Sequence, residues 1–514
     1  MGEPCLIGID IGGTAAKAAL YSFKGHRRAI SRAPYAPVQL AGGGLEYDSE
    51  QLFTSACEAV RQTLLQAQVA ATDVAAVGID GMISGTVGID DAGQPTTPYT
   101  STLDTRYRPF LDAVTERCSD AVRELTGSAK PTVGPKALWV RATMPDAFAG
   151  TRSWVSATTY VGMRLAGLAG DAAYVDQSQL WAYGLADARK GAWSSDLCEA
   201  LDLRPEVLPR IVSSSEVVGG VSAASSKATT LVAGTPIVAG LGDTLAGLLG
   251  AGVTRRGEAG DGAGTYSTLA VCLDSYRAPS AGRDLHVVAG GLPGAWYGLS
   301  FVEGGGLLRS WCLRLLLGDD PGAEAVEHLG ERAGAVEPGS DGLFFVLPGE
   351  TTSASTNPWS RGGWVGTTLA HGPAHLYRSV MEAVAYRQVD ALERIERDNA
   401  IHVNRVLAYG GGARETRWNQ IKTDIAERPY DGLGNSEVTS LGAALIAGLG
   451  VNAIDDPVSV AISARTVQAQ FVPNRAASSK YRALRRSLAT FAEEVASLGA
   501  GRSWVRPASK EQDC

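Results

Sequence analysis

The sequence has no long apolar run and no leader-like N-terminus. Within its 514 residues, no segment offers the about 20 uninterrupted apolar residues that a membrane-spanning helix needs. The longest apolar stretch, around residues 231–253, is interrupted by glycines and by Asp243. The N-terminus lacks a basic segment followed by an apolar one, which predicts that there is no signal peptide. We therefore expect a cytoplasmic protein without a membrane partner.

Cysteine and clustered positive charge are scarce as well. The seven cysteines are scattered, form no Cys-x-x-Cys pair and have no histidine at metal-ligand spacing. This pattern predicts reduced, mostly buried thiols and excludes a disulfide framework or a zinc site of that type. The 46 lysines and arginines are outnumbered by 54 aspartates and glutamates, which gives a net charge of −8. Such a balance argues against nucleic acid as a partner.

Two common nucleotide-binding motifs are also missing. The chain contains no G-x-x-x-x-G-K-[ST] sequence and no G-x-G-x-x-G sequence at the start of a helix. These absences disfavour the P-loop and Rossmann folds. A nucleotide would therefore have to be held by glycine turns of another kind.

Glycine is abundant, with 62 residues, and it separates strand-like from helix-like segments. Leu6–Ile9 and Ala15–Tyr21 are typical of the two arms of a hairpin, and Ser49–Ala67 has apolar residues at helical spacing. This alternation predicts the α/β class. The pattern restarts in the second half of the chain, so we expect two domains of similar design, residues 1–253 and 254–514.

The first glycine turn lies between the arms of the predicted hairpin. Gly12 and Gly13 would let backbone N–H groups approach phosphate oxygens, and the Thr14 hydroxyl can add a hydrogen bond. Asp10, at the end of a buried strand, would supply a carboxylate for Mg²⁺, which prefers oxygen ligands. For this motif alone, an ordinary hairpin with a capping aspartate is the alternative.

The second motif places Asp243 between a glycine turn and a helix of small residues. A carboxylate there satisfies helix N–H groups and is favoured by the helix dipole, so a plain N-cap is one interpretation. Phosphoryl transfer to an alcohol, however, needs a carboxylate that accepts the hydroxyl proton. In a chain with several phosphate-type turns, Asp243 is therefore the candidate general base.

Two more glycine turns follow. Residues 260–267 combine glycines with hydroxyl side chains and predict a second phosphate cradle, which includes Gly264 and Thr265. Residues 409–413 carry three consecutive glycines after a strand, which would let a flat ligand lie against the backbone. Each turn alone could be purely structural, whereas three in this order on an α/β chain indicate a nucleotide site.

With these motifs, the chain resembles the FGGY carbohydrate kinases of the actin/hexokinase/Hsp70 ATPase superfamily. The resemblance runs from Gly8 to about Leu449, and residues 131–140 and 366–382 resemble the two signatures of the family. It implies two actin-like (ribonuclease H-like) α/β domains with an ATP/sugar cleft between them. The sugar would bind to the N-terminal domain and ATP mainly to the C-terminal one.

The resemblance also assigns roles to individual residues. ATP and Mg²⁺ would be the cofactors, with Asp10 holding the metal, and Asp243 would orient the sugar hydroxyl and take its proton. The expected ATP-binding residues are Gly12, Gly13, Thr14, Lys17, Gly264, Thr265, Gly411, Gly412 and Ala413.

The expected sugar pocket departs from the common patterns of the family. Ile83 and Ser84 stand where xylulokinases and gluconokinases usually carry Met-His, and Thr102 replaces the tryptophan of Trp-x-Asp-x-Arg. Asp104 and Arg106 of that motif are kept, and with Ile83, Ser84 and the base they are the candidate sugar contacts. A surface ion pair is the alternative for Asp104 and Arg106. The expected substrate is a pentulose such as xylulose, with a polyol or a sugar acid as the alternative.

Other protein classes fit the sequence less well than a sugar kinase. An actin-like or Hsp70-like ATPase would lack the base, and a kinase of the repressor/glucokinase group would carry a cysteine-rich zinc motif, which is absent here. A regulatory pseudokinase is disfavoured because Asp10 and Asp243 are retained. An isologous homodimer is expected from base rates alone.

Three structural expectations complete the sequence reading. Residues 142–215 are predicted to be mostly helical with loops. His375 is expected to pack or to cap a helix, and Trp311 is expected to lie in the core.

Overall fold

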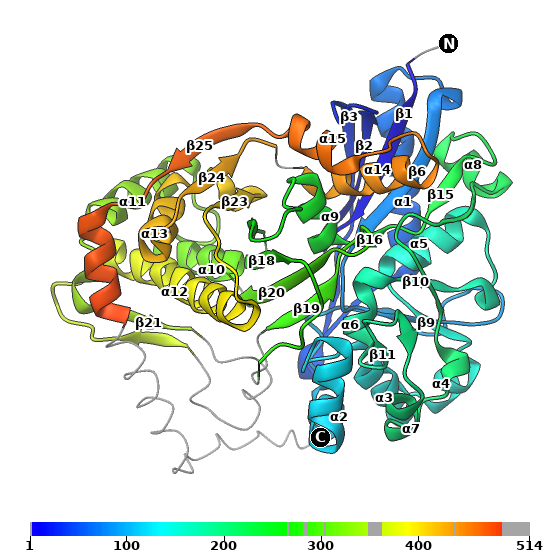
Figure 1. Ribbon diagram of the computed structural model, residues 1–514, viewed down its shortest axis with the longest axis horizontal. Coiled ribbons are helices and arrows are strands. Elements are labelled where there is room, and N and C mark those ends of the chain that lie inside the picture. Colours follow the sequence, from blue (N-terminus) through cyan, green and yellow to red (C-terminus); the bar gives the residue numbers. More distant parts are fainter. Residues whose placement is uncertain are drawn as a thin grey trace, which may run out of the picture. The chain divides into compact units, whose positions relative to one another are not determined.

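The computed structural model describes residues 3–264, 267–280, 285–302, 305–347, 362–435 and 437–485 (Figure 1). These residues divide into two compact units, and neither is continuous in sequence. Unit 1 holds the chain up to Phe301, Asp390–Glu415 and Tyr430–Gln470. Unit 2 holds Val302–Val389, Thr416–Pro429 and the described residues from Phe471 onward.

Unit 1 contains a seven-stranded sheet built around β1 (Cys5–Ile11). Strand β1 pairs antiparallel with β2 (Ala15–Ser22) and parallel with β6 (Val74–Gly81), which confirms the predicted hairpin. The strand order is β14-β15-β6-β1-β2-β3, and β16 pairs with the end of β6. The other members are β3 (Arg27–Pro34), β14 (Val217–Gly220), β15 (Pro236–Val238) and β16 (Leu241–Gly242).

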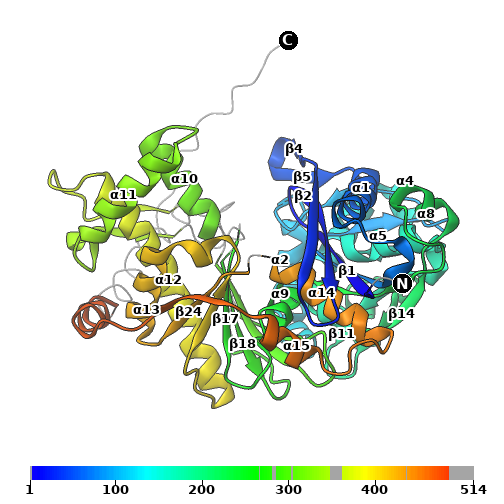
Figure 2. The same ribbon diagram turned by 90° about the horizontal axis from the view of Figure 1, so that it is seen from above.

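Helices cover both faces of this sheet. Ile7 and its alternate neighbours pack with α1 (Ser49–Ala67), and Leu6 faces α14 (Val438–Gly450); both helices can be followed in Figure 2. Every residue of β1 is therefore buried, which explains its continuous apolar run. Helix α14 approaches so closely that a Cβ on Gly8 would lie 1.8 Å from the Ser440 carbonyl oxygen. The approach of the helix thus requires glycine at position 8.

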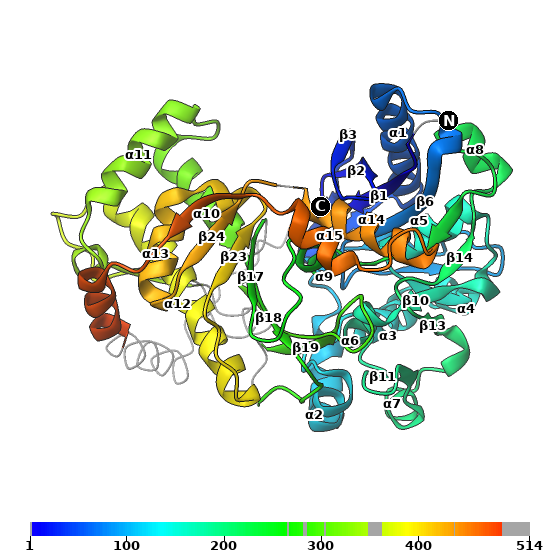
Figure 3. The same cartoon turned by 45° about the horizontal axis from the view of Figure 1, so that its top comes forward.

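A second seven-stranded sheet repeats the plan of the first. The hairpin of β17 (Ala259–Ala263) and β18 (Ser267–Leu273) is antiparallel, and β17 pairs parallel with β23 (Val406–Tyr409). The order is β19-β20-β18-β17-β23-β24-β25, with β19 (His286–Ala289), β20 (Trp296–Val302), β24 (Tyr430–Leu433) and β25 (Val467–Phe471). Figure 3 labels β19, β18, β17, β23 and β24 of this sheet. The restart that the sequence predicted is this second hairpin with its parallel neighbour.

Shorter elements complete unit 1. The prediction that residues 142–215 are mostly helical is wrong in part, because short strands alternate there with helices. Within residues 142–215 these strands are β9 (Ser153–Val155), β10 (Tyr174–Asp176), β11 (Ala186–Asp187), β12 (Ala192–Trp193) and β13 (Arg210–Val212). The other short strands of unit 1 are β4 (Val38–Leu40), β5 (Gly44–Tyr47), β7 (Val87–Ile89) and β8 (Tyr99–Thr100). The helices are α2 (Arg108–Thr126), α3 (Val133–Thr143), α4 (Pro145–Gly150), α5 (Ala157–Ala166), α6 (Leu180–Tyr183), α7 (Ser195–Ala200), α8 (Ala223–Thr229), α9 (Asp243–Gly250) and α15 (Pro457–Ala464).

Unit 2 is mainly helical. Its elements are α10 (Gly305–Leu317), α11 (Ala323–Ala335), β21 (Phe344–Val346), β22 (Gly363–Val365), α13 (Thr416–Ala426) and the part of α12 (Pro373–Asn399) up to Val389. His375 accepts a hydrogen bond on Nδ1 from the Gly372 N–H at 3.1 Å, which confirms the predicted cap. The prediction that Trp311 is a core residue is wrong, because the residue is 39% exposed and stacks on Trp364.

Two absences that the sequence predicted can be checked on the described residues. Among them, no helix is long and apolar enough to cross a membrane. The six described cysteines form no disulfide, and five of them are buried, which agrees with the predicted thiols.

Candidate active site

Three aspartates lie at the same edge of the first sheet. Asp10 and Asp80 are register partners on the parallel strands β1 and β6, one residue before each strand ends. Asp243 directly follows β16, whose Gly242 pairs with Gly81. Because the carboxyl ends of parallel strands meet at one edge, the fold gathers these three carboxyl groups there, where α/β proteins commonly bind ligands.

Asp10 is part of a charged network. Its Oδ2 lies 3.4 Å from Lys17 Nζ and accepts a hydrogen bond from Thr439 Oγ1 at 3.1 Å. The same lysine lies 3.2 Å from Glu437 Oε2. Burial raises the pKa of Asp10, and the neighbouring ammonium opposes that shift. Lys17, expected from the sequence to bind ATP, is thus held between two carboxylates that come from β1 and from the start of α14.

Two tyrosine side chains hold the glycine turn after β1 by hydrogen bonds to its carbonyl groups. The phenolic hydroxyl groups of Tyr35 and Tyr47 donate to the carbonyl oxygens of Gly12 and Gly13, respectively. Gly13 and Thr14 are exposed. The turn is therefore fixed through its carbonyl groups and presents its tip to solvent, as a phosphate cradle requires.

Asp243 opens helix α9 but does not cap it. Gly242 is the N-cap residue, and the Asp243 Oδ1 accepts hydrogen bonds from the N–H and the hydroxyl of Thr244 at 2.6 and 3.2 Å. The plain N-cap interpretation is therefore wrong. The carboxyl group keeps some contact with solvent, yet its surroundings are mostly protein, and this burial together with the charge of Asp10 raises its pKa to about 7.

Asp80 differs from its two neighbours. It is fully buried, and neither carboxyl oxygen has a hydrogen-bond partner within the described part of the chain. Burial, followed by the charges of Asp10 and Asp243, raises its pKa well above the ordinary value. Both effects favour the neutral form of this carboxyl group.

The loop after β6 carries two predicted sugar residues and brings one of them, Ile83, next to the segment of the candidate base. A Cβ on Gly242 would lie 2.3 Å from Ile83 Cγ2, so the side chain of Ile83 covers the residue that precedes Asp243. Ser84 is buried and has a φ of 67°. The Thr102 hydroxyl donates to the Ile83 carbonyl oxygen at 2.5 Å. The structure thus connects the 83–84 loop with the segment that carries the other predicted sugar contacts.

Asp104 and Arg106 form an ion pair in which the carboxylate is buried and the guanidinium is half-buried, with 20% of the Arg106 side chain exposed. Asp104 is 2% exposed, and Arg106 Nε lies 3.1 Å from both of its carboxyl oxygens. Although burial alone would raise the pKa of Asp104, hydrogen bonds from Arg106 lower it. Arg106 also pairs with Glu46 and lies 4.4 Å from the centre of the Trp139 ring. The guanidinium is therefore fixed on three sides.

The two later glycine turns lie against each other. A Cβ on Gly412 would lie 2.3 Å from the Cβ of Ala263, at the end of β17. Gly410 has a φ of 80°, and Ala413 in the following 3₁₀ turn is buried. Gly411 and Gly412 are thus brought to the end of the strand that leads into Gly264. Thr265 lies outside the described residues.

Asp10 can take part in holding Mg²⁺. Its Oδ1 accepts no hydrogen bond from the described residues and lies near the glycine turn, since a Cβ on Gly12 would be 3.7 Å from it. Within the described ranges no three histidine, cysteine or acidic side chains are grouped to hold a metal. This donor set fits a cation that keeps waters and is shared with phosphates, as Mg²⁺ is.

Sequence reasoning missed several members of this site. Thr439 and the tyrosines behind the glycine turn are distant in sequence from the residues they contact and belong to no local motif. Lys136 was noticed only as a signature residue. A lysine inside the otherwise apolar residues 133–140 of α3 was the signal that could have marked it as a buried, partnered cation.

Comparisons with known proteins bear on the whole chain. Residues 5–250 match the N-terminal domain of the FGGY family of carbohydrate kinases, and residues 263–451 match its C-terminal domain. Xylulose kinase of Bacillus subtilis (strain 168) is 25% identical over 483 residues, which cover 93% of this chain and 95% of that protein.

Relatives of other stated activities are equally similar. Autoinducer-2 kinase of Klebsiella pneumoniae subsp. pneumoniae is 26% identical, with 91% of this chain and 90% of that protein covered. Glycerol kinase of Deinococcus radiodurans is also 26% identical, with coverages of 87% and 89%. Relatedness at this level does not select one substrate.

Solved structures share the fold. Ligand-bound xylulose kinase from Lactobacillus acidophilus superposes with a TM-score of 0.87 at 19% identity, covering 97% of this chain and 100% of that one. Gluconate kinase from the same organism gives 0.86 at 19% identity, with coverages of 97% and 99%. The predicted α/β fold of the actin-like kinases is confirmed.

The two domain matches also set aside the actin-like, Hsp70-like and repressor/glucokinase alternatives. Enzymes of the matched family are phosphotransferases that use ATP to phosphorylate a sugar hydroxyl. This chain belongs to the FGGY family of carbohydrate kinases.

Proposed function

We propose that this sugar or polyol kinase phosphorylates a pentulose such as xylulose, with Asp243 as the general base. The observation that carries the proposal is the placement of Asp243 at the shared strand edge, next to Ile83 and within the electrostatic reach of Asp10. With a pKa of about 7, a large fraction of this carboxyl group is ionised at neutral pH and still basic enough to accept a hydroxyl proton.

The first domain, residues 1–253, would bind the sugar. Thr244 fixes the rotation of the Asp243 carboxyl group, so one oxygen stays directed to a substrate hydroxyl. Ile83 and Ser84 would line the pocket beside the base. Asp104 and Arg106 would present a rigid polar edge, because their mutual hydrogen bonds leave little side-chain freedom.

The second domain, residues 254–514, would bind most of ATP. Gly264, Thr265, Gly411, Gly412 and Ala413 form its expected part of the nucleotide site, and Gly12, Gly13, Thr14 and Lys17 form the part on the first domain. Asp10 would hold Mg²⁺ through water. Bound Mg²⁺ would neutralise charge on the phosphate oxygens. In our proposal the working enzyme is cytoplasmic and an isologous homodimer.

The choice of a pentulose is supported by xylulose kinases among both the relatives and the solved structures. A polyol is the second candidate, because glycerol kinases are equally similar. Ser84, which stands in place of the histidine usual in xylulokinases and gluconokinases, would change a hydrogen bond to the substrate at that point.

The experiment is an ADP-release assay with Mg·ATP and a panel of pentuloses, polyols and sugar acids. We expect one compound class to stimulate ADP release, and Asp243→Asn to lower its turnover roughly 10²–10⁴-fold. Asp196→Asn is the matched control, because Asp196 is an exposed first-turn aspartate of α7 in the same unit. Near-normal turnover in Asp243→Asn would remove the base assignment, and stimulation only by polyols or sugar acids would replace the pentulose.

A further inference from the structure

Lys136 makes an unusual set of contacts inside unit 1. It lies on α3, is 1% exposed, and its Nζ donates hydrogen bonds to three backbone carbonyl oxygens. The acceptors are Ser84 at 2.7 Å, Ser101 at 2.8 Å and Thr100 at 3.3 Å. The ring of Tyr107 completes the surroundings, with its centre 5.1 Å from Nζ. No carboxylate of the described chain bonds to this ammonium.

A buried cation without an anionic partner needs hydrogen bonds that offset the loss of its hydration. The three N–H groups of an ammonium match three carbonyl acceptors, so every donor of Lys136 is satisfied. Burial nevertheless lowers the pKa of this lysine to about 7, because removing an ammonium group from water costs free energy. An apolar residue would fill the same space in α3 without that cost. The lysine therefore contributes something other than packing.

The three carbonyl groups belong to two separate loops. Ser84 ends the turn that places Ile83 beside Gly242. Its backbone lies in the left-handed region, which residues other than glycine rarely adopt. Ser101 opens the turn that presents Asp104, whose N–H also donates to the Ser101 carbonyl oxygen. These loops carry all four predicted sugar contacts other than the base.

We infer that Lys136 is a positioning residue for the sugar, which ties the 83–84 loop to the 101–106 loop and so fixes the shape of the sugar-facing surface. The inference rests on the proposed function. Through the Ser84 carbonyl the lysine fixes the backbone next to the base, and through Ser101 it fixes the start of the Asp104–Arg106 turn. Lys136 would contact neither the sugar nor ATP, and it would act on the binding of the sugar through these two loops.

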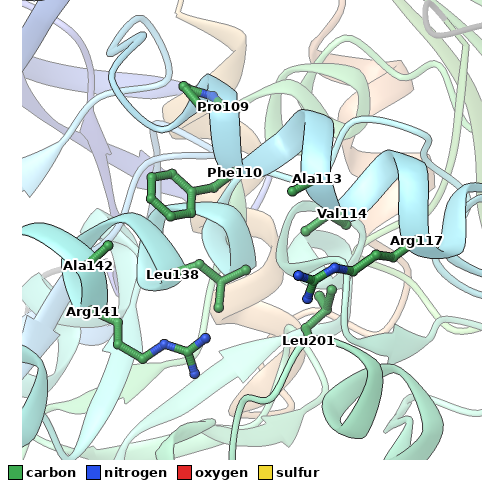
Figure 4. A pocket seen from close by; sticks show the side chains of 9 residues that line it. All are labelled: Pro109, Phe110, Ala113, Val114, Arg117, Leu138, Arg141, Ala142 and Leu201. Atoms are coloured by element: carbon green, nitrogen blue, oxygen red, sulfur yellow. The ribbon is translucent and has the colours of Figure 1, made fainter.

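The same helix offers a matched control. Leu138 is buried but faces a pocket of about 310 Å³ between α2 and α3, together with Phe110, Val114 and Leu201 (Figure 4). It bonds to neither loop. Leu138→Ala therefore weakens the packing of α3 and leaves the three carbonyl contacts of the lysine in place.

The test compares Lys136→Met and Lys136→Arg with Leu138→Ala in the full chain. For the sugar that the wild type phosphorylates, we expect the lysine variants to raise its KM about 10-fold or more, since small misplacements of binding groups are costly. The KM for ATP should change less than about twofold, because no described residue of the expected ATP turns bonds to Lys136. Leu138→Ala should lower the melting temperature and leave both KM values unchanged.

A second measurement needs no substrate. Hydrogen exchange of peptides that cover residues 82–106 should be faster in the lysine variants than in Leu138→Ala. Equal changes in both KM values, or the same exchange in all three variants, would overturn the inference. So would failure of both lysine variants to fold while Leu138→Ala folds, because that result assigns Lys136 to stability alone. A wild type that phosphorylates no sugar would refute the proposed function, whereas altered exchange would still support the tie between the loops.

Discussion

Replacing Gly8 by alanine would place a methyl group in space that helix α14 occupies. The added Cβ would lie 1.8 Å from the Ser440 carbonyl oxygen and 3.1 Å from the Ala444 nitrogen, and both are backbone atoms that cannot rotate away. To restore an ordinary contact of 3.4 Å, strand and helix must separate by about 1.6 Å. Overpacking of this kind costs about 1–3 kcal/mol, and we expect roughly 3 kcal/mol here because no side chain can relax instead.

The displacement would also reach the catalytic edge. Thr439 and Glu437 lie next to Ser440 at the start of α14, and they bond to Asp10 and Lys17 at 3.1 and 3.2 Å. Moving the helix by about half the length of such a bond breaks both hydrogen bonds. Gly8→Ala should therefore lower kcat in addition to the free energy of unfolding, although no atom of Gly8 contacts a substrate.

The assay combines chemical unfolding with steady-state kinetics at a temperature at which the variant is folded. Gly150→Ala is the control, because a Cβ at that position meets nothing within 4 Å and the change should be neutral or slightly stabilising. A Gly8→Ala protein with wild-type stability would refute the packing argument. A destabilised variant with unchanged kcat would refute the coupling of α14 to Asp10.

Two further predictions concern the buried acids. In the wild type, kcat/KM should rise about tenfold per pH unit below pH 7 and level off above it, because the base must be deprotonated and its pKa is about 7; a flat profile would contradict the role of Asp243. Because burial raises the pKa of Asp80, the folded protein should lose stability as the pH rises above the unfolded-state value of about 3.9. Asp80→Asn has no proton to lose, so its free energy of unfolding should decline less between pH 5 and pH 8, and equal declines would contradict a raised pKa of Asp80.

Local features of the fold could be predicted from the sequence. The hairpin around Gly12 and the helix Ser49–Ala67 follow from apolar spacing and turn residues that lie close together in the chain. Strands β1 and β23 were found in the same way, because glycine turns follow them. The short strands β9 to β13 were missed, since two or three residues provide no periodicity.

Long-range partners could not be predicted. The contact between Asp10 and Thr439 joins residues 429 positions apart, and no local pattern marks it. Asp104 and Arg106 were singled out by their resemblance to a family motif, but the surroundings of Arg106 depend on Glu46 and Trp139, which come from other elements. The position of Trp311 also involves a distant partner, because its ring stacks on that of Trp364. The sequence thus identifies reactive residues more readily than the residues that hold them.

The ring of Tyr409 lies among three glycines, one on α9 and two on β17. Cβ atoms on Gly247, Gly260 and Gly262 would each lie 3.1 Å from it, so none of the three can gain a methyl group without displacing the ring. Gly247 belongs to the helix that starts at Asp243, and Tyr409 ends the strand that leads into the Gly410 turn. One aromatic side chain therefore acts as a spacer between the helix that Asp243 opens and the strand that leads into the Gly410 turn.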